Sequence, residues 1–202
     1  VVTGTVNADV LVGTGVNNFI GGLAGNDVIT GGSGIDFVHA GDGNDTVNTG
    51  DGNDAVIGGA GNDVINTGAG DDFIWASDGD VATAGNDVIN GGAGNDFVGY
   101  IGRNFDYFFT YDAPTDTFTV TDIKATNDQG AIYNTNDGVD TLISIEGIVF
   151  TDPSGTGPLV INKTVGTAAA ETITGTFANN LIFGLAGDDV INGGAGKVYL
   201  DG

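Results

Sequence analysis

The sequence contains no cysteine, one histidine and only four lysine and arginine residues among its 202 amino acids. The absence of cysteine excludes a disulfide scaffold and any thiolate metal site. A single histidine excludes the HExxH zinc site of metalloproteases, which needs two. No stretch of the chain is long and apolar enough to cross a bilayer. The opening residues, VVTGTVNADV, lack the basic region and cleavage pattern of a signal peptide.

Acidic residues are abundant. They number 27, which gives a formal net charge of −23 at pH 7. A charge of this size repels nucleic acids and anionic membranes, and it destabilises a compact state until cations bind. We therefore predict no nucleic-acid partner and no membrane insertion.

Glycine is also frequent, with 38 residues, and it marks a nine-residue repeat between Gly22 and Gly99. The units read GLAGNDVIT, GGSGIDFVH, AGDGNDTVN, TGDGNDAVI, GGAGNDVIN, TGAGDDFIW and, after an interruption, ATAGNDVIN and GGAGNDFVG. Glycines at the first, second and fourth places allow a tight turn, and a branched aliphatic residue at the eighth place suits a β-strand. Such a unit has room for one turn and one three-residue strand, so units must stack to bury their apolar side. The pattern predicts an all-β fold, a parallel β-roll or β-helix solenoid.

The acids at the sixth place are predicted to form two columns, because every second unit falls on the same side if two units make one coil. One column contains Asp27, Asp45, Asp63 and Asp87, and the other contains Asp36, Asp54, Asp72 and Asp96. Adjacent carboxylates would lie on the order of 5 Å apart and repel by about 1 kcal/mol in water. No basic residue interleaves them, so a divalent cation with oxygen ligands is the expected counter-charge. Flexible all-oxygen ligation favours calcium over magnesium.

These units resemble the RTX (repeats-in-toxin) nonapeptide G-G-x-G-x-D-x-U-x, where U is a large aliphatic residue. The resemblance implies a calcium-binding β-roll in a bacterial protein that is secreted or held at the cell surface, commonly after type I export. It also implies several calcium ions, each held between turns two units apart by sixth-place acids and alternate backbone carbonyls. The carbonyls so implied belong to Gly25, Gly32, Gly34, Gly41, Gly43, Gly50, Gly52, Gly59, Gly61, Gly68, Gly70, Gly85, Gly92, Gly94 and Gly187.

The repeat continues upstream in a weaker form, as GTVNADVLV and GTGVNNFIG. The sixth places there are Asp9, which can pair with Asp27, and Asn18, which would offer Asp36 a neutral oxygen in a weaker metal site. Capping of the solenoid end is the alternative interpretation of Asn18, because terminal repeats are commonly atypical. Six extra residues at 76–81 interrupt the repeat and are predicted to form a surface loop.

A change of composition divides the chain into three parts: a repeat block over residues 1–99, a non-repeat segment over 100–161 and a second repeat block over 162–202. The middle segment shows alternating strand patterns at 106–112 and 116–123, with a hairpin turn between them and two short strands further on. Its GRNFDY and DGVDTLISIEGIVFTD stretches resemble the β region that follows the repeats in serralysin-type proteins. We predict a small antiparallel β cap, with a surface loop at 124–136.

The nonapeptide returns at Gly166 as GTAAAETIT, GTFANNLIF, GLAGDDVIN and GGAGKVYLD. These four units align with those that begin at Gly4, at an offset of 162 residues. In this second, short β-roll block, Glu171 and Asp189 would share a calcium ion, whereas Val198 ends the other column. The chain thus reads as one whole module of 162 residues followed by the opening coils of the next.

No motif supports catalysis, and we predict that the chain is not an enzyme. Ser33 lacks the final glycine of a nucleophile elbow, and the repeat places an acid where a dinucleotide-binding fingerprint needs its third glycine.

Two functions remain open. The first is an extracellular structural module that folds on calcium binding and stacks with copies of itself end to end, as in an adhesin, surface layer or fibre. The alternative is a calcium-dependent export and folding module of a type I-secreted hydrolase, serralysin-like or lipase-like. An upstream catalytic domain would favour the alternative, and more copies of the module would favour the first.

Overall fold

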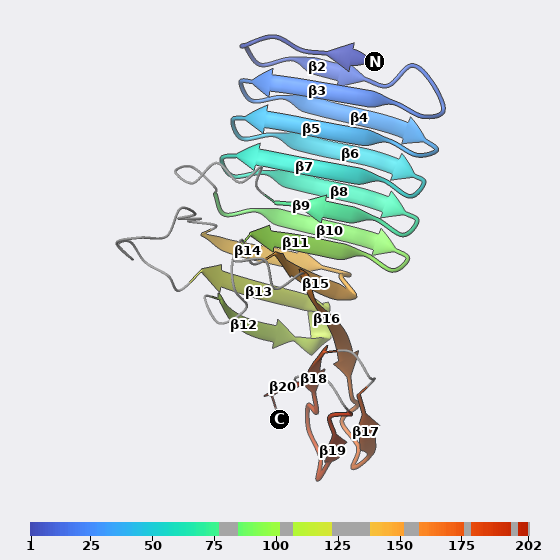
Figure 1. Ribbon diagram of the computed structural model, residues 1–202, viewed down its shortest axis with the longest axis vertical. Helices are drawn as coiled ribbons and strands as arrows, with labels where there is room; N and C mark the ends of the chain where they lie inside the picture. The colour runs from blue at the N-terminus through green and yellow to red at the C-terminus, as the bar shows by residue number, and fades with distance from the viewer. Residues whose placement is uncertain are drawn as a thin grey trace.

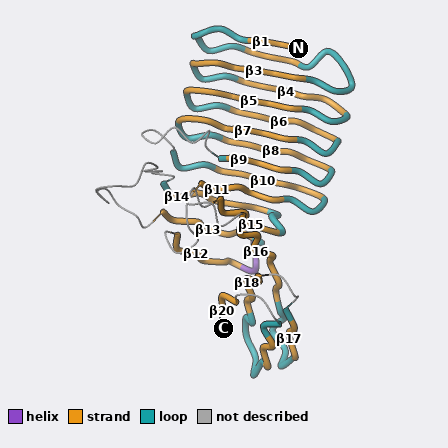
Figure 2. The backbone as a smooth tube through the Cα atoms, viewed as in Figure 1, coloured by secondary structure: helices purple, strands orange, loops and turns teal. Residues whose placement is uncertain are grey.

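The computed structural model describes residues 1–76, 85–101, 107–122, 138–151, 158–175, 179–194 and 198–201. Most of these residues form two long β-sheets, whose strands follow one another along the long axis of the molecule (Figure 1). Strands and turns alternate along each coil, so that successive strands lie in opposite sheets (Figure 2). Within the described residues, no helix is long and apolar enough to cross a membrane. The prediction of an all-β solenoid is confirmed.

The first sheet has ten strands in this spatial order: β1 (Val2–Thr3), β3 (Phe19–Ala24), β5 (Phe37–Asp42), β7 (Ala55–Ala60), β9 (Phe73–Trp75), β11 (Phe97–Ile101), β15 (Gly147–Thr151), β16 (Pro158–Val165), β18 (Asn179–Phe183) and β20 (Val198–Asp201). The second has eight: β12 (Tyr107–Asp112), β13 (Thr117–Asp122), β14 (Val139–Ile143), β10 (Val88–Ala93), β8 (Val64–Ala69), β6 (Thr46–Asp51), β4 (Val28–Ser33) and β2 (Val10–Val12). A third sheet pairs β17 (Thr172–Thr174) with β19 (Val190–Asn192). Neighbouring repeat strands pair in parallel at 18-residue steps, as Phe19 does with Phe37, so two nonapeptides make one coil.

Most strands of the repeat block are longer than the three residues that we predicted. Strand β6, for example, has six residues and pairs with β8 as far as Asp51 opposite Ala69. The reason is that the strand continues into the glycine-rich half of the next unit, where Gly50 still pairs with Gly68. The turns between sheets are correspondingly tight.

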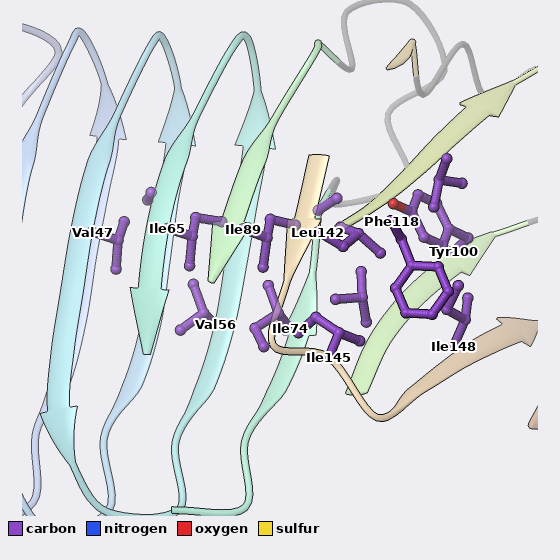
Figure 3. Packing of buried hydrophobic residues seen from close by; sticks show 14 of the residues in the cluster. Val47, Val56, Ile65, Ile74, Ile89, Tyr100, Phe118, Leu142, Ile145 and Ile148 are labelled. Atoms are coloured by element: carbon purple, nitrogen blue, oxygen red, sulfur yellow. The ribbon is translucent and has the colours of Figure 1, made fainter. Parts of the chain in front are cut away.

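The aliphatic residues of the eighth place form the core between the two sheets. Val47, Ile65 and Ile89 lie in one row, and Val56 and Ile74 lie in the facing row (Figure 3). Each is at most 1% exposed. Burial of one such side chain stabilises the fold by about 1.5–3 kcal/mol, so every added coil extends a continuous apolar core.

The middle segment adds two parallel strands, which together make one further coil, as well as a cap. Strand β14 pairs in parallel with β10, and β15 pairs in parallel with β11, so Leu142 and Ile148 extend the two core rows. The predicted antiparallel pairing is present between β12 and β13, which the 3-10 helix η2 (Ala113–Thr115) connects, and also between β13 and β14 and between β15 and β16. The predicted loop 124–136, and the extra residues of 76–81 beyond Ala76, lie outside the described residues.

The second block repeats the strand register of the first at the 162-residue offset. Strand β1 pairs with β3 through Val2 and Ile20, and β16 pairs with β18 through Thr164 and Ile182, each residue 162 positions later. The pairs β2–β4 and β17–β19 correspond in the same way. Strands β17 and β19 run closer to the long axis of the molecule, whereas the strands of the first block cross it (Figure 1). Strand β16 therefore both closes the first module and opens the second block.

Candidate metal centre

The structure brings the sixth-place residues into two columns. The backbone N–H of each residue donates a hydrogen bond to a carboxylate oxygen, Oδ1, of the acid one coil later, at N···O distances of 2.6 to 2.9 Å. The first column is Asp9, Asp27, Asp45, Asp63 and Asp87, and the second is Asn18, Asp36, Asp54, Asp72 and Asp96. Both columns follow the predicted order, and the role of these side chains as metal ligands is our proposal.

The column aspartates after Asp9 are buried, with at most 3% of each residue exposed. Their second carboxylate oxygen, Oδ2, often has no hydrogen-bond partner within the described part of the chain. This holds for Asp27, Asp36, Asp45, Asp54, Asp63, Asp72 and Asp96. Leaving a buried ionised group without a partner costs on the order of several kcal/mol, so a missing positive group is indicated in each coil from Asp27 to Asp96.

In the turns that begin with a glycine, a backbone carbonyl lies close to the Oδ2 atom that has no partner (the orphan oxygen). A Cβ placed on Gly22 would lie 2.4 Å from Asp27 Oδ2 and 2.1 Å from the carbonyl oxygen of Ala40. Two oxygen atoms cannot hydrogen-bond to each other, because both are acceptors. A cation between the coils would satisfy both. These first-place carbonyls were not among the ligands that the sequence implied.

Asn18 provides an internal comparison. Its side-chain nitrogen Nδ2 lies where the orphan Oδ2 lies in the aspartates, and it donates to the carbonyl of Gly31 at 3.3 Å and to Asp36 Oδ1 at 2.8 Å. Its own Oδ1 accepts the backbone N–H of Gly15 at 3.0 Å. At this end of the column, an amide N–H thus supplies the positive group that the aspartates lack. The capping interpretation of Asn18 agrees with this geometry better than the ligand interpretation.

Burial raises the pKa of four column carboxyls, those of Asp45, Asp54, Asp63 and Asp96. It raises the pKa of Asp63 to about 8 and that of Asp96 to about 6, and it raises the pKa of Asp45 and Asp54 above the ordinary value. Backbone and side-chain hydrogen-bond donors oppose the rise, whereas the neighbouring carboxylates of the column add to it. Burial therefore disfavours the charged form of these four carboxyls, and a positive charge between the coils would offset that effect.

The glycine-rich turns of successive coils approach one another closely. A Cβ on Gly43, where φ is +138°, would lie 1.9 Å from the carbonyl oxygen of Gly25. The carbonyls of these places therefore point toward the next coil, as ligands shared between coils must. Of the glycines implied as carbonyl ligands, all except Gly85 have positive φ: Gly25, Gly32, Gly34, Gly41, Gly43, Gly50, Gly52, Gly59, Gly61, Gly68, Gly70, Gly92, Gly94 and Gly187.

Two acids of the middle segment, neither of which was predicted as a ligand, extend the columns. The N–H of Asp87 donates to Asp140 Oδ1 at 2.9 Å, and the N–H of Asp96 donates to Glu146 Oε2 at 2.9 Å. The hydroxyl of Tyr100 donates to the other oxygen of Asp140 at 2.8 Å. A signal was available, because each acid precedes a core aliphatic residue by two positions, as the sixth place precedes the eighth.

The second block pairs the two acids that were predicted to share an ion. The N–H of Glu171 donates to Asp189 Oδ1 at 3.2 Å. Nδ2 of Asn180 donates to the carbonyl of Gly193 at 3.3 Å, the counterpart of the Asn18 contact one module earlier. The block therefore reproduces the opening of the first module in its polar contacts as well as its strands.

The residues fit calcium. Among the described residues, no three acidic or histidine side chains converge on one point, so carboxylates alone cannot complete a site. Backbone carbonyls must supply the remaining ligands, and calcium accepts six to eight oxygen ligands in flexible geometry. Successive column acids and the first-, second- and fourth-place carbonyls of their turns would hold it. A bound ion would supply positive charge between the coils.

Comparison with known proteins gives the same chemistry. The family model described as the RTX calcium-binding nonapeptide repeat matches residues 3–38, 21–56, 30–65, 48–80, 81–99 and 165–199, which together are more than half of the chain. Among curated proteins, none matches the sequence. Among solved structures, the extracellular lipase LipA from Serratia marcescens is similar at a TM-score of 0.28 and 18% sequence identity, over 94% of this chain and 28% of the lipase. The chain thus spans less than a third of the length of that lipase.

Proposed function

Because the chain belongs to the family of RTX calcium-binding nonapeptide repeats, we propose that it is an extracellular structural module that folds on calcium binding and associates end to end. The repeats themselves bind calcium and are a structural rather than a catalytic element. Repeats of this kind are typical of secreted bacterial proteins. An adhesin, a surface layer or a fibre is the setting we propose, with calcium ions and further copies of the module as partners and no catalytic role.

The observation that carries this proposal is the repeated register at the 162-residue offset. Strand β16 pairs with β15 of the first module on one side and with β18 of the second block on the other, and the 162-residue boundary lies within it. A tandem array built this way needs no flexible linker, because the strand that closes one module opens the next. Solenoids are stabilised by such nearest-neighbour contacts, so an array of modules would form a continuous rod.

The outer strands of the two sheets are the places where a further copy would pair. Strands β1 and β20 are the outer strands of the ten-stranded sheet, and β2 is an outer strand of the eight-stranded sheet. Strand edges carry unpaired backbone groups that pair readily with another chain. A contact between opposite ends is heterologous, and it propagates into a filament unless it closes into a ring.

Electron microscopy and light scattering of the purified chain test the proposal, in millimolar calcium and in chelator. We expect elongated particles whose mass increases with protein concentration in calcium, and no association in chelator. A folded monomer at every concentration in calcium would contradict end-to-end association. It would favour the second candidate, a calcium-dependent folding and export module of a secreted hydrolase, which the calcium-binding family equally supports.

A further inference from the structure

The turn between β14 and β15 differs from the repeat turns beside it. Ile89 and Val98 are nine residues apart in the last repeat coil, whereas their strand partners, Leu142 and Ile148, are only six apart. The turn that carries Glu146 is therefore three residues shorter than a nonapeptide turn, and it lies outside the segments that match the repeat family.

A glutamate compensates for the shorter turn. Glu146 Oε2 accepts the backbone N–H of Asp96 at 2.9 Å, and Asp96 Oδ1 accepts that of Asp72 at the same distance. The additional methylene group lets a side chain from a shorter turn take the place that aspartate takes elsewhere. The column thus continues one step beyond the last nonapeptide.

The orphan oxygen also recurs at this step. Asp96 is fully buried, and its Oδ2 has no hydrogen-bond partner among the described residues. A Cβ on Gly91 would lie 2.5 Å from this oxygen and 2.6 Å from the carbonyl oxygen of Ser144. Asp36 Oδ2 and the carbonyl of Thr49 have the same relation three positions earlier in this column, around Gly31. Carboxylate and carbonyl oxygens therefore converge here as they do within the nonapeptides.

We propose that Asp96, Glu146 and the Ser144 carbonyl form a further divalent-cation site, outside the nonapeptides, that ties the last repeat coil to the cap. This site rests on the proposed function, because it assumes that calcium ions lie between successive acids of the two columns, an arrangement that we call the calcium ladder. It extends the ladder to a shorter turn and to a glutamate. Calcium is the cation expected, because the ligands are flexible and all oxygen.

Lys163 marks the end of this column. Its ammonium lies 3.8 Å from Glu146 Oε1 and donates to Asp116 Oδ1 at 2.9 Å. The orphan oxygen of Asp96 faces the Ser144 carbonyl, and no hydrogen bond joins it to Lys163.

Native mass spectrometry of the full chain in saturating calcium counts the bound ions. Glu146→Gln is expected to bind one ion fewer than the unchanged chain. Asp51→Asn is the matched control, because it makes the same charge change at an exposed acid outside the columns, and it is expected to keep the full count. An unchanged count and affinity for Glu146→Gln, while Asp54→Asn within the repeats loses ions, would overturn this site and leave the ladder intact. Absence of calcium from the unchanged chain would overturn the ladder itself.

Lys163→Gln gives a second test that does not depend on the folding of the Glu146 variant. If a cation occupies the site, this variant keeps the ion count, because Asp96, Glu146 and Ser144 remain. If Lys163 alone neutralises the end of the column, its removal creates a new site and the count rises by one. A rise of one ion would overturn the proposal.

Discussion

Asp54 illustrates how one residue serves two coils. Its Oδ1 accepts the N–H of Asp36 at 2.8 Å, its own N–H donates to Asp72 Oδ1 at 2.7 Å, and its Oδ2 has no partner among the described residues. We predict that Asp54→Ala weakens two adjacent calcium sites rather than one, by at least about tenfold each, since loss of even an outer-shell group commonly costs that much. Calorimetric calcium titration measures the effect, with Asp51→Ala as the control. Unchanged stoichiometry and affinity would refute shared ligation.

Gly43 and Gly21 form a matched pair for testing backbone packing. A Cβ on Gly43 would meet the carbonyl oxygen of Gly25 at 1.9 Å, in a backbone with φ of +138°, whereas a Cβ on Gly21 meets nothing within 4 Å. We predict that Gly43→Ala destabilises the calcium-bound fold by about 2–4 kcal/mol, from strain at positive φ and overpacking together. Gly21→Ala is expected to change stability by less than about 1 kcal/mol. Denaturant titration in calcium compares the two, and equal effects would contradict the close approach of the coils.

Features that recur with the nine-residue period could be predicted from the sequence. Features that depart from the period could not. The buried eighth-place residues and the order of the acid columns follow from spacing alone, because each unit makes the same contacts as its neighbour. Glu146 was missed because its turn is shorter and its acid is a glutamate, although Ile148 follows it at the usual distance. The first-place carbonyls were missed because backbone direction in a turn is invisible to a pattern of side chains.

At the scale of the elements, a cluster joins the cap to the second block. The ammonium of Lys163 in β16 donates a hydrogen bond to Asp116, beside η2, and lies 5.4 Å from the ring centroid of Phe118. Phe183 of β18 packs against Phe118 and Tyr111, with ring centroids 5.5 and 4.6 Å apart. Burial alone would raise the pKa of Asp116, but Lys163 and Tyr111 lower it below its ordinary value. Sequence could not predict these contacts, since they join segments that no repeat relates.

We predict that Lys163→Met loosens this joint without disturbing the repeats. Asp116 is 45% exposed, so loss of its ion pair should cost only about 1 kcal/mol, which is roughly a fivefold faster amide exchange. Hydrogen exchange in calcium should show that change in β16 and β18, with β4 and β6 as internal references. A uniform change over all four strands would mean that the joint is not a separate element of stability.

At the scale of the whole molecule, the charge of −23 and the buried acid columns both require cations for the chain to fold. The general field can be screened by any salt, because the Debye length is about 8 Å at physiological ionic strength. The orphan oxygens cannot be satisfied that way, since they are buried beside carbonyls and need a ligated ion. The apolar core and the ladder are therefore coupled: each coil that stacks buries one aliphatic residue and one acid per turn.

We predict that chelation converts the chain to an expanded coil, with a radius of gyration of about 48 Å for its 202 residues. Circular dichroism and small-angle X-ray scattering across a chelator titration measure the transition. Molar sodium chloride, added to the chelated chain, separates screening from ligation. If screening sufficed, the β signal would return in salt, and the orphan oxygens would have no part in folding. We expect salt to compact the chain only slightly and millimolar calcium to restore the β-roll, with magnesium less effective because it demands a smaller, octahedral shell and releases its water reluctantly.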